Sequence, residues 1–203
     1  MLSVREAMQP EIREKLDQYH AILKRWQKTI NLVSPKTMDD AWSRHFEDSL
    51  QLLPHIPEDT QTLWDLGSGA GFPGLVIAIS RPDISVNLIE SDTRKSAFLS
   101  NVSRETLSGN VHVRNDRLEQ ILNDLPPPDV MTARAFSSLL KIFTMTQAVW
   151  ELNENIVFVL PKGRNVSVEI DEAETKFQFD FDEKPSTIDD ESCILIVSNL
   201  RVL

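Results

Sequence analysis

The feature that most constrains the fold is a glycine-rich turn between two apolar segments. Residues 63–74 read Leu-Trp-Asp-Leu-Gly-Ser-Gly-Ala-Gly-Phe-Pro-Gly, and a second apolar run follows at 75–79. Glycine lacks the Cβ atom that opposes positive φ or the close approach of a ligand, and proline is tolerated at the first helical position. The pattern predicts a strand, a tight turn and a helix, with a ligand bound at the turn.

The spacing of the glycines indicates which ligand. A dinucleotide-binding turn reads G-x-G-x-x-G, but here Phe72 fills the third slot and the glycines fall at positions 67, 69 and 71. G-x-G-x-G after an acidic strand end is typical of a site for S-adenosylmethionine, which carries no phosphate. An acid about 20 residues further on is expected to hold the ribose hydroxyls, and Glu90 at the end of the run 84–89 has that position. We therefore predict an S-adenosylmethionine cofactor, with a plain strand-to-helix turn as the alternative.

The rest of the chain alternates strand and helix patterns, as in a doubly wound α/β domain. Strands are expected at 63–66, 84–89, 111–114, 129–133, 156–160, 177–181 and 193–199. Helices are expected at 93–107, 118–122 and 139–152, the first stopped by Gly109, with a turn at 161–165 before a further helix. Because no long helix separates the last two strands, we expect them to be antiparallel. The fold class predicted is α/β, a seven-stranded, mostly parallel Rossmann-like sheet with helices on both faces.

Residues 1–60 are expected to form an N-terminal helical cap packed on a methyltransferase domain at 61–203, in one compact unit. Apolar residues recur at steps of three and four in the segment 10–30, the mark of an amphipathic helix; they are Leu16, Tyr19, Leu23, Trp26 and Ile30. A second helix is expected to begin at Thr37, which forms a capping box with Asp40, and to end at Leu53.

The charge balance bears on the partner. The net charge of −10 argues against a nucleic acid, because affinity for phosphate backbones comes largely from Lys and Arg. However, residues 169–203 hold ten acids and three bases, so −7 of the −10 lies there, whereas residues 131–168 hold four bases and two acids. A local basic face is therefore compatible with the sequence.

No apolar run approaches the roughly 20 residues of a membrane span, and the amino end lacks a signal-peptide layout, so we expect a cytoplasmic protein.

The residues after the fourth strand indicate which atom is methylated. Enzymes that methylate an exocyclic amine typically use an Asn/Asp-Pro-Pro-aromatic turn there, and those that methylate a pyrimidine carbon use a cysteine. Here residues 133–138 read Ala-Arg-Ala-Phe-Ser-Ser, the similar run 124–128 precedes the strand, and Cys193 lies in the last strand. Methylation of a ring nitrogen such as guanine N7 needs fewer catalytic groups, because the nitrogen lone pair is already nucleophilic and no proton is lost.

Ligands of such sheets lie at the carboxyl ends of the strands. The adenine is expected near Leu118 and Glu119, and the methyl group is expected to point toward the fourth strand. Arg134 can hold the cofactor or a phosphate, and Phe136 can stack on a base. A core position for Phe136 and a structural role for Arg134 are the alternatives.

Five separate motifs together resemble one family. They are Asn31-Leu32, the run 44–49 (Arg-His-Phe-Glu-Asp-Ser), the run 65–74, the run 134–136 (Arg-Ala-Phe) and Lys162-Gly163. The set is similar to the glucose-inhibited division protein B family, the bacterial guanine-N7 methyltransferases of small-subunit ribosomal RNA, and spans about residues 10–200. The resemblance implies methyl transfer from S-adenosylmethionine to guanine N7 of that RNA, or of the small ribosomal subunit, by a monomer without a metal.

The resemblance also implies roles for particular residues. The residues that it implies are combined here with the glycine loop and Glu90. The expected cofactor contacts are then Gly67, Gly69, Phe72, Glu90, Leu118, Glu119 and Arg134. The expected substrate contacts are Asn31, Asp48, Phe136 and Lys162. Arg134 and His45 are expected to position the substrate for transfer. Arg44 and Asp48 lie one helical turn apart and could pair. A structural role for His45 and a solvated turn position for Lys162 are the alternatives.

Two rival functions are open on the sequence. A small-molecule methyltransferase would suit the acidity, and would need the N-terminal helices to close a lid over a small dry pocket. An open cleft rimmed by positive side chains would speak against it; these are Arg44, Arg134, Lys162 and Arg164. The second rival is a non-catalytic ribosome-assembly factor that kept the fold, which the intact glycine loop and Glu90 disfavour.

Overall fold

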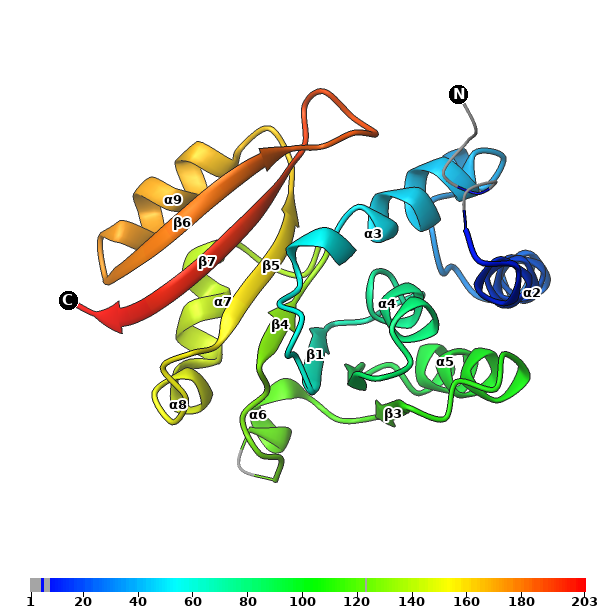
Figure 1. Ribbon diagram of the computed structural model, residues 1–203, viewed down its shortest axis with the longest axis horizontal. Coiled ribbons are helices and arrows are strands. Elements are labelled where there is room, and N and C mark those ends of the chain that lie inside the picture. The colour runs from blue at the N-terminus through cyan, green and yellow to red at the C-terminus, as the bar shows by residue number, and fades with distance from the viewer. Residues whose placement is uncertain (1–4, 6–7, 123) are drawn as a thin grey trace.

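A computed structural model of the chain describes residue 5, residues 8–122 and residues 124–203, so the first residues of the expected cap lie partly outside the described part. Its centre is a seven-stranded sheet with the strand order β3-β2-β1-β4-β5-β7-β6 (Figure 1). The strands are β1 (Thr62–Leu66), β2 (Ser85–Ile89), β3 (Val111–Arg114), β4 (Val130–Thr132), β5 (Val157–Lys162), β6 (Phe177–Pro185) and β7 (Cys193–Val202). The first five are parallel and β7 is antiparallel to both neighbours, which confirms the predicted fold class.

Helices cover both faces of the sheet, as Figure 1 shows. They are α2 (Pro10–Trp26), α3 (Asp48–Leu50), α4 (Gly74–Ser80), α5 (Thr93–Glu105), α6 (Leu118–Ile121), α7 (Leu139–Met145), α8 (Gln147–Trp150) and α9 (Val166–Glu174). Alternate side chains of a strand point to opposite faces. In β1, Leu63 packs in one core with residues of α2, α4 and α5, whereas Trp64 and Leu66 pack in a second core with α6 to α9.

The N-terminal segment shares the first of these two cores. Leu16 and Leu23 of α2 are fully buried, and α2 contacts both α4 and α5. Between α2 and β1 the chain forms a 3-10 turn at Pro35–Thr37, a π-helical segment at Trp42–Glu47, α3, and a second 3-10 turn at Leu53–His55. The helical segments on this side therefore pack directly against the sheet domain.

The expected helix start at Thr37 is wrong. The next helical segment begins only at Trp42, and the Thr37 hydroxyl does not cap it. Instead that hydroxyl donates to Ser34 O at 2.9 Å and lies 2.9 Å from His45 Nε2. The Thr37 hydroxyl thus contacts a side chain eight residues further along the chain instead of capping a helix. This contact depends on the tertiary structure.

Other boundaries also differ from the expected ones: α2 ends at Trp26 rather than near residue 30, and β6 and β7 extend to Pro185 and Val202. Leu107, not Gly109, takes the left-handed conformation after α5, with φ +51° and the Ser108 N–H donating to Ser103 O, as in a Schellman motif. Strand β5 continues through Pro161 and Lys162, which pair with β7, so the turn starts later. The helix expected at 139–152 breaks at Thr146, whose hydroxyl donates to Ile142 O at 2.8 Å. Among the described residues, no helix combines the length and apolarity needed to cross a membrane.

Candidate active site

A cavity of about 830 Å³ lies at the carboxyl ends of β1, β2 and β4. Its walls come from four parts of the chain: residues before α3, the glycine loop, the segments after β2 to β4, and the loop between β6 and β7. Sites for small molecules and cofactors commonly measure roughly 300–1,000 Å³. The position agrees with the edge at which doubly wound sheets bind ligands.

The glycine loop needs glycine for two reasons. Gly67, Gly69 and Gly71 have φ values of +66°, +55° and +90°, which other residues rarely adopt. In addition, a Cβ on Gly67 would lie 2.3 Å from Phe136 Cδ2, and one on Gly71 would lie 2.8 Å from the Tyr19 hydroxyl. The loop therefore packs tightly between the N-terminal helix and the segment after β4.

Glu90 ties the end of β2 to this loop. Its Oε2 accepts from the Gly69 N–H at 2.8 Å, and its Oε1 accepts from the Asp92 N–H at 2.7 Å. Each carboxylate oxygen can accept a further hydrogen bond, and Glu90 lines the cavity. Ile89 and Leu118 add an apolar wall beside it, and Glu119 lines the same region. These residues fit the ribose and adenine of S-adenosylmethionine.

Tyr19 is a supporting residue that the sequence analysis missed as part of the site. Its hydroxyl donates to the buried carbonyl of Ala70, and its ring stacks on Phe72 with a centroid distance of 5.3 Å. The only signal in the sequence was the helical spacing of Tyr19, which indicated a core residue. Helix α2 thus contacts the glycine loop directly.

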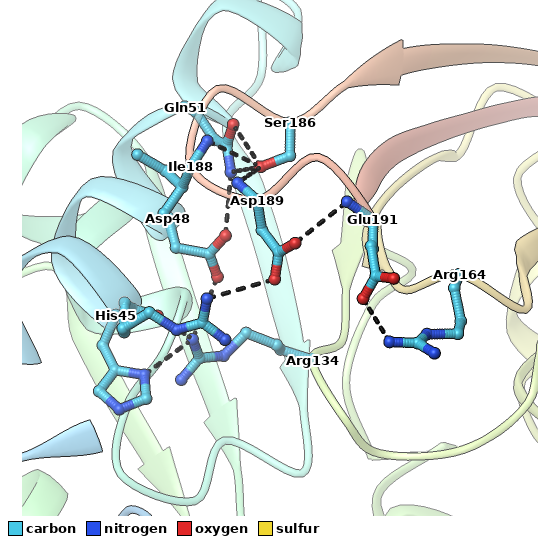
Figure 2. Close-up of polar contacts among 10 residues, drawn as sticks. His45, Asp48, Gln51, Arg134, Arg164, Ser186, Ile188, Asp189 and Glu191 are labelled. Carbon is cyan, nitrogen blue, oxygen red and sulfur yellow. Dashed lines mark hydrogen bonds and ion pairs between the residues drawn. The ribbon is translucent and has the colours of Figure 1, made fainter. Parts of the chain in front are cut away.

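Arg134 follows the end of β4 by two residues and lines the cavity, where it contacts residues from the segment 44–48 (Figure 2). Its Nη1 donates to His45 Nδ1 at 3.1 Å, to Asp48 Oδ2 at 3.2 Å and to Arg44 O at 3.4 Å. Its guanidinium carbon lies 5.0 Å from the centroid of the Phe72 ring. Residues 89 and 86 positions away in sequence are therefore joined by one side chain.

The hydrogen bonds fix the tautomer of His45. Because Arg134 can only donate, Nδ1 is the acceptor; because the Thr37 hydroxyl donates to Ser34 O, Nε2–H is the donor to Thr37. Burial, then the positive charges of Arg134 and Arg44, lower the pKa of His45 from 6.5 to about 4. His45 is thus a neutral imidazole at pH 7.

Asp65 is a second residue that the sequence analysis did not place in the site, although it noted the acid at the strand end. Its side chain is buried below the glycine loop, and its Oδ2 accepts from the Gly74 N–H at 3.2 Å. Among the described residues, Oδ1 has no hydrogen-bond partner. Burial raises the pKa of Asp65 from 3.8 to about 7.

Most of the predicted site residues line the cavity, and two do not. Those that do are Gly67, Gly69, Phe72, Glu90, Leu118, Glu119, Arg134, His45, Asp48 and Phe136. Asn31 lies outside it, after the end of α2, where Gln27 Nε2 approaches its Oδ1 at 3.4 Å. Lys162 lines a neighbouring cavity with Asp48 and Arg134.

Lys162 is held inside the protein. Its Nζ donates to Glu169 Oε2 at 2.7 Å and to Ser137 O at 3.4 Å, and its side chain is only 7% exposed. The same Glu169 oxygen accepts from the Leu139 N–H at 2.8 Å. The solvated turn position considered for Lys162 is therefore wrong.

The pairing considered for Arg44 and Asp48 is also wrong. Asp48 pairs with Arg134, and Arg44 pairs with Asp189 of the loop between β6 and β7 at 3.2 Å. Both partners are distant in sequence, so helical spacing could not identify them.

The comparisons with known proteins point to one family. The profile of the GidB family, described as rRNA small subunit methyltransferase G, matches residues 12–190. The ribosomal RNA small subunit methyltransferase G of Methylorubrum extorquens is 41% identical over 193 residues, covering 94% of this chain and 90% of the relative. The protein of that name from Brucella ovis is 39% identical over 202 residues, covering 96% and 91%.

Solved structures share the fold at low sequence identity. Cofactor-bound Rv0187 from MTB superimposes with a TM-score of 0.62 at 11% identity, covering 91% of this chain and 88% of that one. The O-methyltransferase TomG from Streptomyces achromogenes, in complex with SAM, has a TM-score of 0.61 at 12% identity, covering 92% and 90%. At these identities the likeness concerns the fold alone.

Proposed function

The chain belongs to the GidB family, rRNA small subunit methyltransferase G, and on this premise we propose that it moves a methyl group from S-adenosylmethionine to N7 of a guanine in small-subunit ribosomal RNA. The observation that carries the choice of atom is the His45 imidazole, whose two nitrogens are both engaged. The pKa of His45 is near 4, and Arg134 already donates to its Nδ1. This nitrogen is therefore not available to accept a proton from the substrate. A reaction that needs no base fits this site.

S-adenosylmethionine, when bound, supplies a methyl group on a positively charged sulfur. The glycine loop and Glu90 would hold this cofactor, and Arg134 and His45 line the same cavity. A guanine N7 lone pair would take up this methyl group while the carbon–sulfur electron pair returned to sulfur, and no proton would need to move. The protein's contribution is then to hold the base in line and to exclude other orientations.

The roles of individual residues belong to this proposal. We assign the cofactor to Gly67, Gly69, Phe72, Glu90, Leu118, Glu119 and Arg134, all of which line the cavity. Asp48 and Phe136 bind the guanine, with Phe136 as the stacking surface because it is half-buried and lines the cavity. Asn31 contacts RNA outside the cavity, and Lys162 acts on the substrate through Glu169 and the segment after β4.

The partner proposed is the small ribosomal subunit or its RNA, and the protein is proposed to act on it as a cytoplasmic monomer. Light scattering on the purified protein tests the monomer: a mass near 23.1 kDa is expected. A dimer mass at working concentrations would contradict it.

The function is tested by methyl transfer from labelled S-adenosylmethionine to small ribosomal subunits, stripped ribosomal RNA and a small-molecule extract in parallel. Digestion of the RNA and mass identification of the labelled nucleoside should give 7-methylguanosine. Label on another base atom would contradict the N7 assignment. Label only in the small-molecule fraction would favour the small-molecule enzyme.

Arg134→Ala in the same assay tests the site. The variant should lose transfer by at least about a hundredfold, because three acceptors lose their common donor and the positioning of the base is lost. Arg94→Ala, an exposed arginine on α5, is the matched control and should transfer at the wild-type rate. Wild-type turnover in Arg134→Ala would remove Arg134 from the site.

A further inference from the structure

An open groove of about 450 Å³ adjoins the cofactor cavity. The two hollows share Arg44, Asp189 and Ser192, so the Arg44–Asp189 pair stands at the boundary between them. Beyond this pair the groove continues along Arg164 and Asn165 at the end of β5. A polymer whose reacting unit enters the cavity would leave through this groove.

The loop of residues 186–192, between β6 and β7, forms the other wall of the groove. Figure 1 shows it reaching toward α3. Gln51 holds it there: its Oε1 accepts from the Thr187 N–H at 2.9 Å, and its Nε2 donates to Ser186 Oγ at 3.1 Å. The Ser186 N–H donates to Ser192 O at 2.9 Å and closes the base of the loop.

This loop places one carboxylate on each arginine of the groove (Figure 2). Asp189 Oδ2 accepts from Arg44 at 3.2 Å while its Oδ1 accepts from the Glu191 N–H at 3.0 Å, and Glu191 pairs with Arg164. Three of the four side chains are exposed and Asp189 is partly exposed: the fractions are 46% for Arg44, 31% for Asp189, 70% for Arg164 and 61% for Glu191. Exposed pairs of this kind contribute little to stability and are screened by salt, so they exchange partners readily.

We propose that Arg44 and Arg164 bind two backbone phosphates of the RNA, and that Asp189 and Glu191 occupy these arginines until the RNA displaces them. The inference rests on the proposed RNA substrate. A phosphate accepts from guanidinium in the same forked geometry as a carboxylate, and carries more acceptor oxygens. Arg44 and Arg164 thereby change one anionic partner for another.

The charges around the groove favour phosphates as the incoming partner. Its remaining acid, Glu169, is already neutralised by Lys162 at 2.7 Å. Once the loop carboxylates leave, Arg44 and Arg164 are two uncompensated cations beside the cavity in which the base reacts. A nucleotide drawn out of its stack brings its flanking phosphates to the mouth of the pocket. Displacement of the two loop carboxylates would thus expose a local positive site on a chain whose net charge is −10.

The test measures the dissociation constant for stripped small-subunit ribosomal RNA and for small ribosomal subunits over a range of KCl concentrations. The variant Asp189→Asn with Glu191→Gln should bind RNA about three- to tenfold more tightly, because the competing carboxylates are gone. The variant Arg44→Gln with Arg164→Gln should bind more weakly, and its salt slope should fall by about two, one for each lost phosphate contact.

A matched control neutralises two acids elsewhere. Asp83→Asn with Glu58→Gln changes the net charge by the same amount beside Arg81, at the amino ends of the strands. It should bind RNA within about twofold of wild type, because salt screens the interaction between the RNA phosphates and charges far from the groove. Melting temperatures report folding, and the single variants Glu191→Gln and Arg164→Gln, on exposed side chains, serve if a double variant does not fold.

Equal tightening by both acid-neutralised variants would show a general charge effect and overturn the inference. An unchanged salt slope in the arginine variant would overturn it too. In both cases wild type would still bind and methylate RNA, so the proposed function would stand. A wild-type protein that neither binds nor methylates RNA would overturn both.

Discussion

At the scale of single residues, the site is organised by the charge of Arg134. Its bonds to described residues all pass through Nη1, which leaves Nε and Nη2 for ligands of the cavity that it lines. The same positive charge, with burial as the larger cause, keeps the pKa of His45 low. Arg134 therefore fixes the position of His45 and adds to the effect of burial on its protonation state.

The protonation state of His45 can be measured directly. With a pKa of about 4 in the folded protein against 6.5 ordinarily, His45 should remain neutral above pH 5.5. NMR titration of its imidazole protons, assigned by their loss in His45→Gln, checks this. In Arg134→Ala the pKa of His45 should rise, because a nearby like charge is removed. A midpoint near 6.5 in the wild type would contradict the hydrogen-bond assignment.

The same shift predicts the direction of an acid effect on stability. Between pH 4 and pH 6.5 the unfolded chain binds the His45 proton and the folded chain does not. The contribution of neutral His45 to stability is therefore complete above pH 6.5 and is lost as the pH falls toward 4. His45→Gln should show a shallower loss of stability over this interval in urea titrations, and an unaltered slope would contradict the expectation.

Asp65 predicts the opposite dependence. Its pKa is near 7 when folded and 3.8 ordinarily, so stability from this group is greatest below pH 3.8 and is lost as the pH rises through 7. Asp65→Asn should raise the free energy of unfolding at pH 8, by on the order of 2–4 kcal/mol, with little gain at pH 4. Urea unfolding at the two pH values checks this. A gain equal at both would assign the effect to something other than the buried charge.

At the scale of elements, the glycine loop is held from three sides: by Tyr19 of α2, by Glu90 after β2 and by Phe136 after β4. Gly67→Ala should displace the Phe136 ring, since the new Cβ would lie 2.3 Å from it. Cofactor affinity should fall at least about tenfold, equal to 1.4 kcal/mol. Gly109→Ala, whose Cβ would have no atom within 4 Å, is the control and should bind the cofactor as wild type does in calorimetry.

The link between α2 and the loop makes a separate prediction. Tyr19→Phe keeps the ring on Phe72 but leaves the buried carbonyl of Ala70 without its donor, which should cost about 1–3 kcal/mol of stability. Cofactor affinity should fall with it, because the carbonyl belongs to the loop. Calorimetry and urea unfolding on the same sample check both effects. Stability lost with unchanged cofactor affinity would show that α2 does not position the loop.

Local patterns predicted the elements, and their failures have tertiary causes. Most strands were predicted because short apolar runs lie between turn residues, and β6 because residues 177–181 alternate apolar and polar side chains. Thr37 was misplaced because its hydroxyl donates to Ser34 O and contacts His45, so that it does not cap the helical segment that follows. The extension of β5 through Pro161 and Lys162 depends on β7, more than thirty residues later in the chain. Propensity carries no information on such partners.

At the scale of the whole molecule, we propose that residues 1–60 and 61–203 unfold together. Leu16 and Leu23 of α2 share a core with Leu63 and Val86 of the sheet. Leu23→Ala should lower the free energy of unfolding by about 2–5 kcal/mol and keep a single transition. Tryptophan fluorescence and far-UV circular dichroism should give the same midpoint, since tryptophans lie in both parts. Two separate transitions would show independent units.

The sequence predicted those site residues that follow a strand end or that belong to a motif of the family. The glycine loop, Glu90 and Arg134 follow strand ends, so the sheet rule placed them, whereas the pairs of Arg44 with Asp189 and of Asp48 with Arg134 join residues 145 and 86 positions apart. Nothing in the local sequence of either partner specifies such contacts. The family resemblance pointed to His45 and Asp48, and the structure adds the bonds through which they act together.

The strand order also has a consequence for biosynthesis. In the described sheet, β6 pairs with β7, and β7 lies between β6 and β5 although it comes after both in the chain. A ribosome delivers residues from the amino end, so β6 leaves the exit tunnel with no strand beside it and waits for residues 193–202. The wall that carries Asp189 closes only then. The nascent chain can therefore complete its glycine loop well before it acquires the part of the active-site rim that carries Asp189.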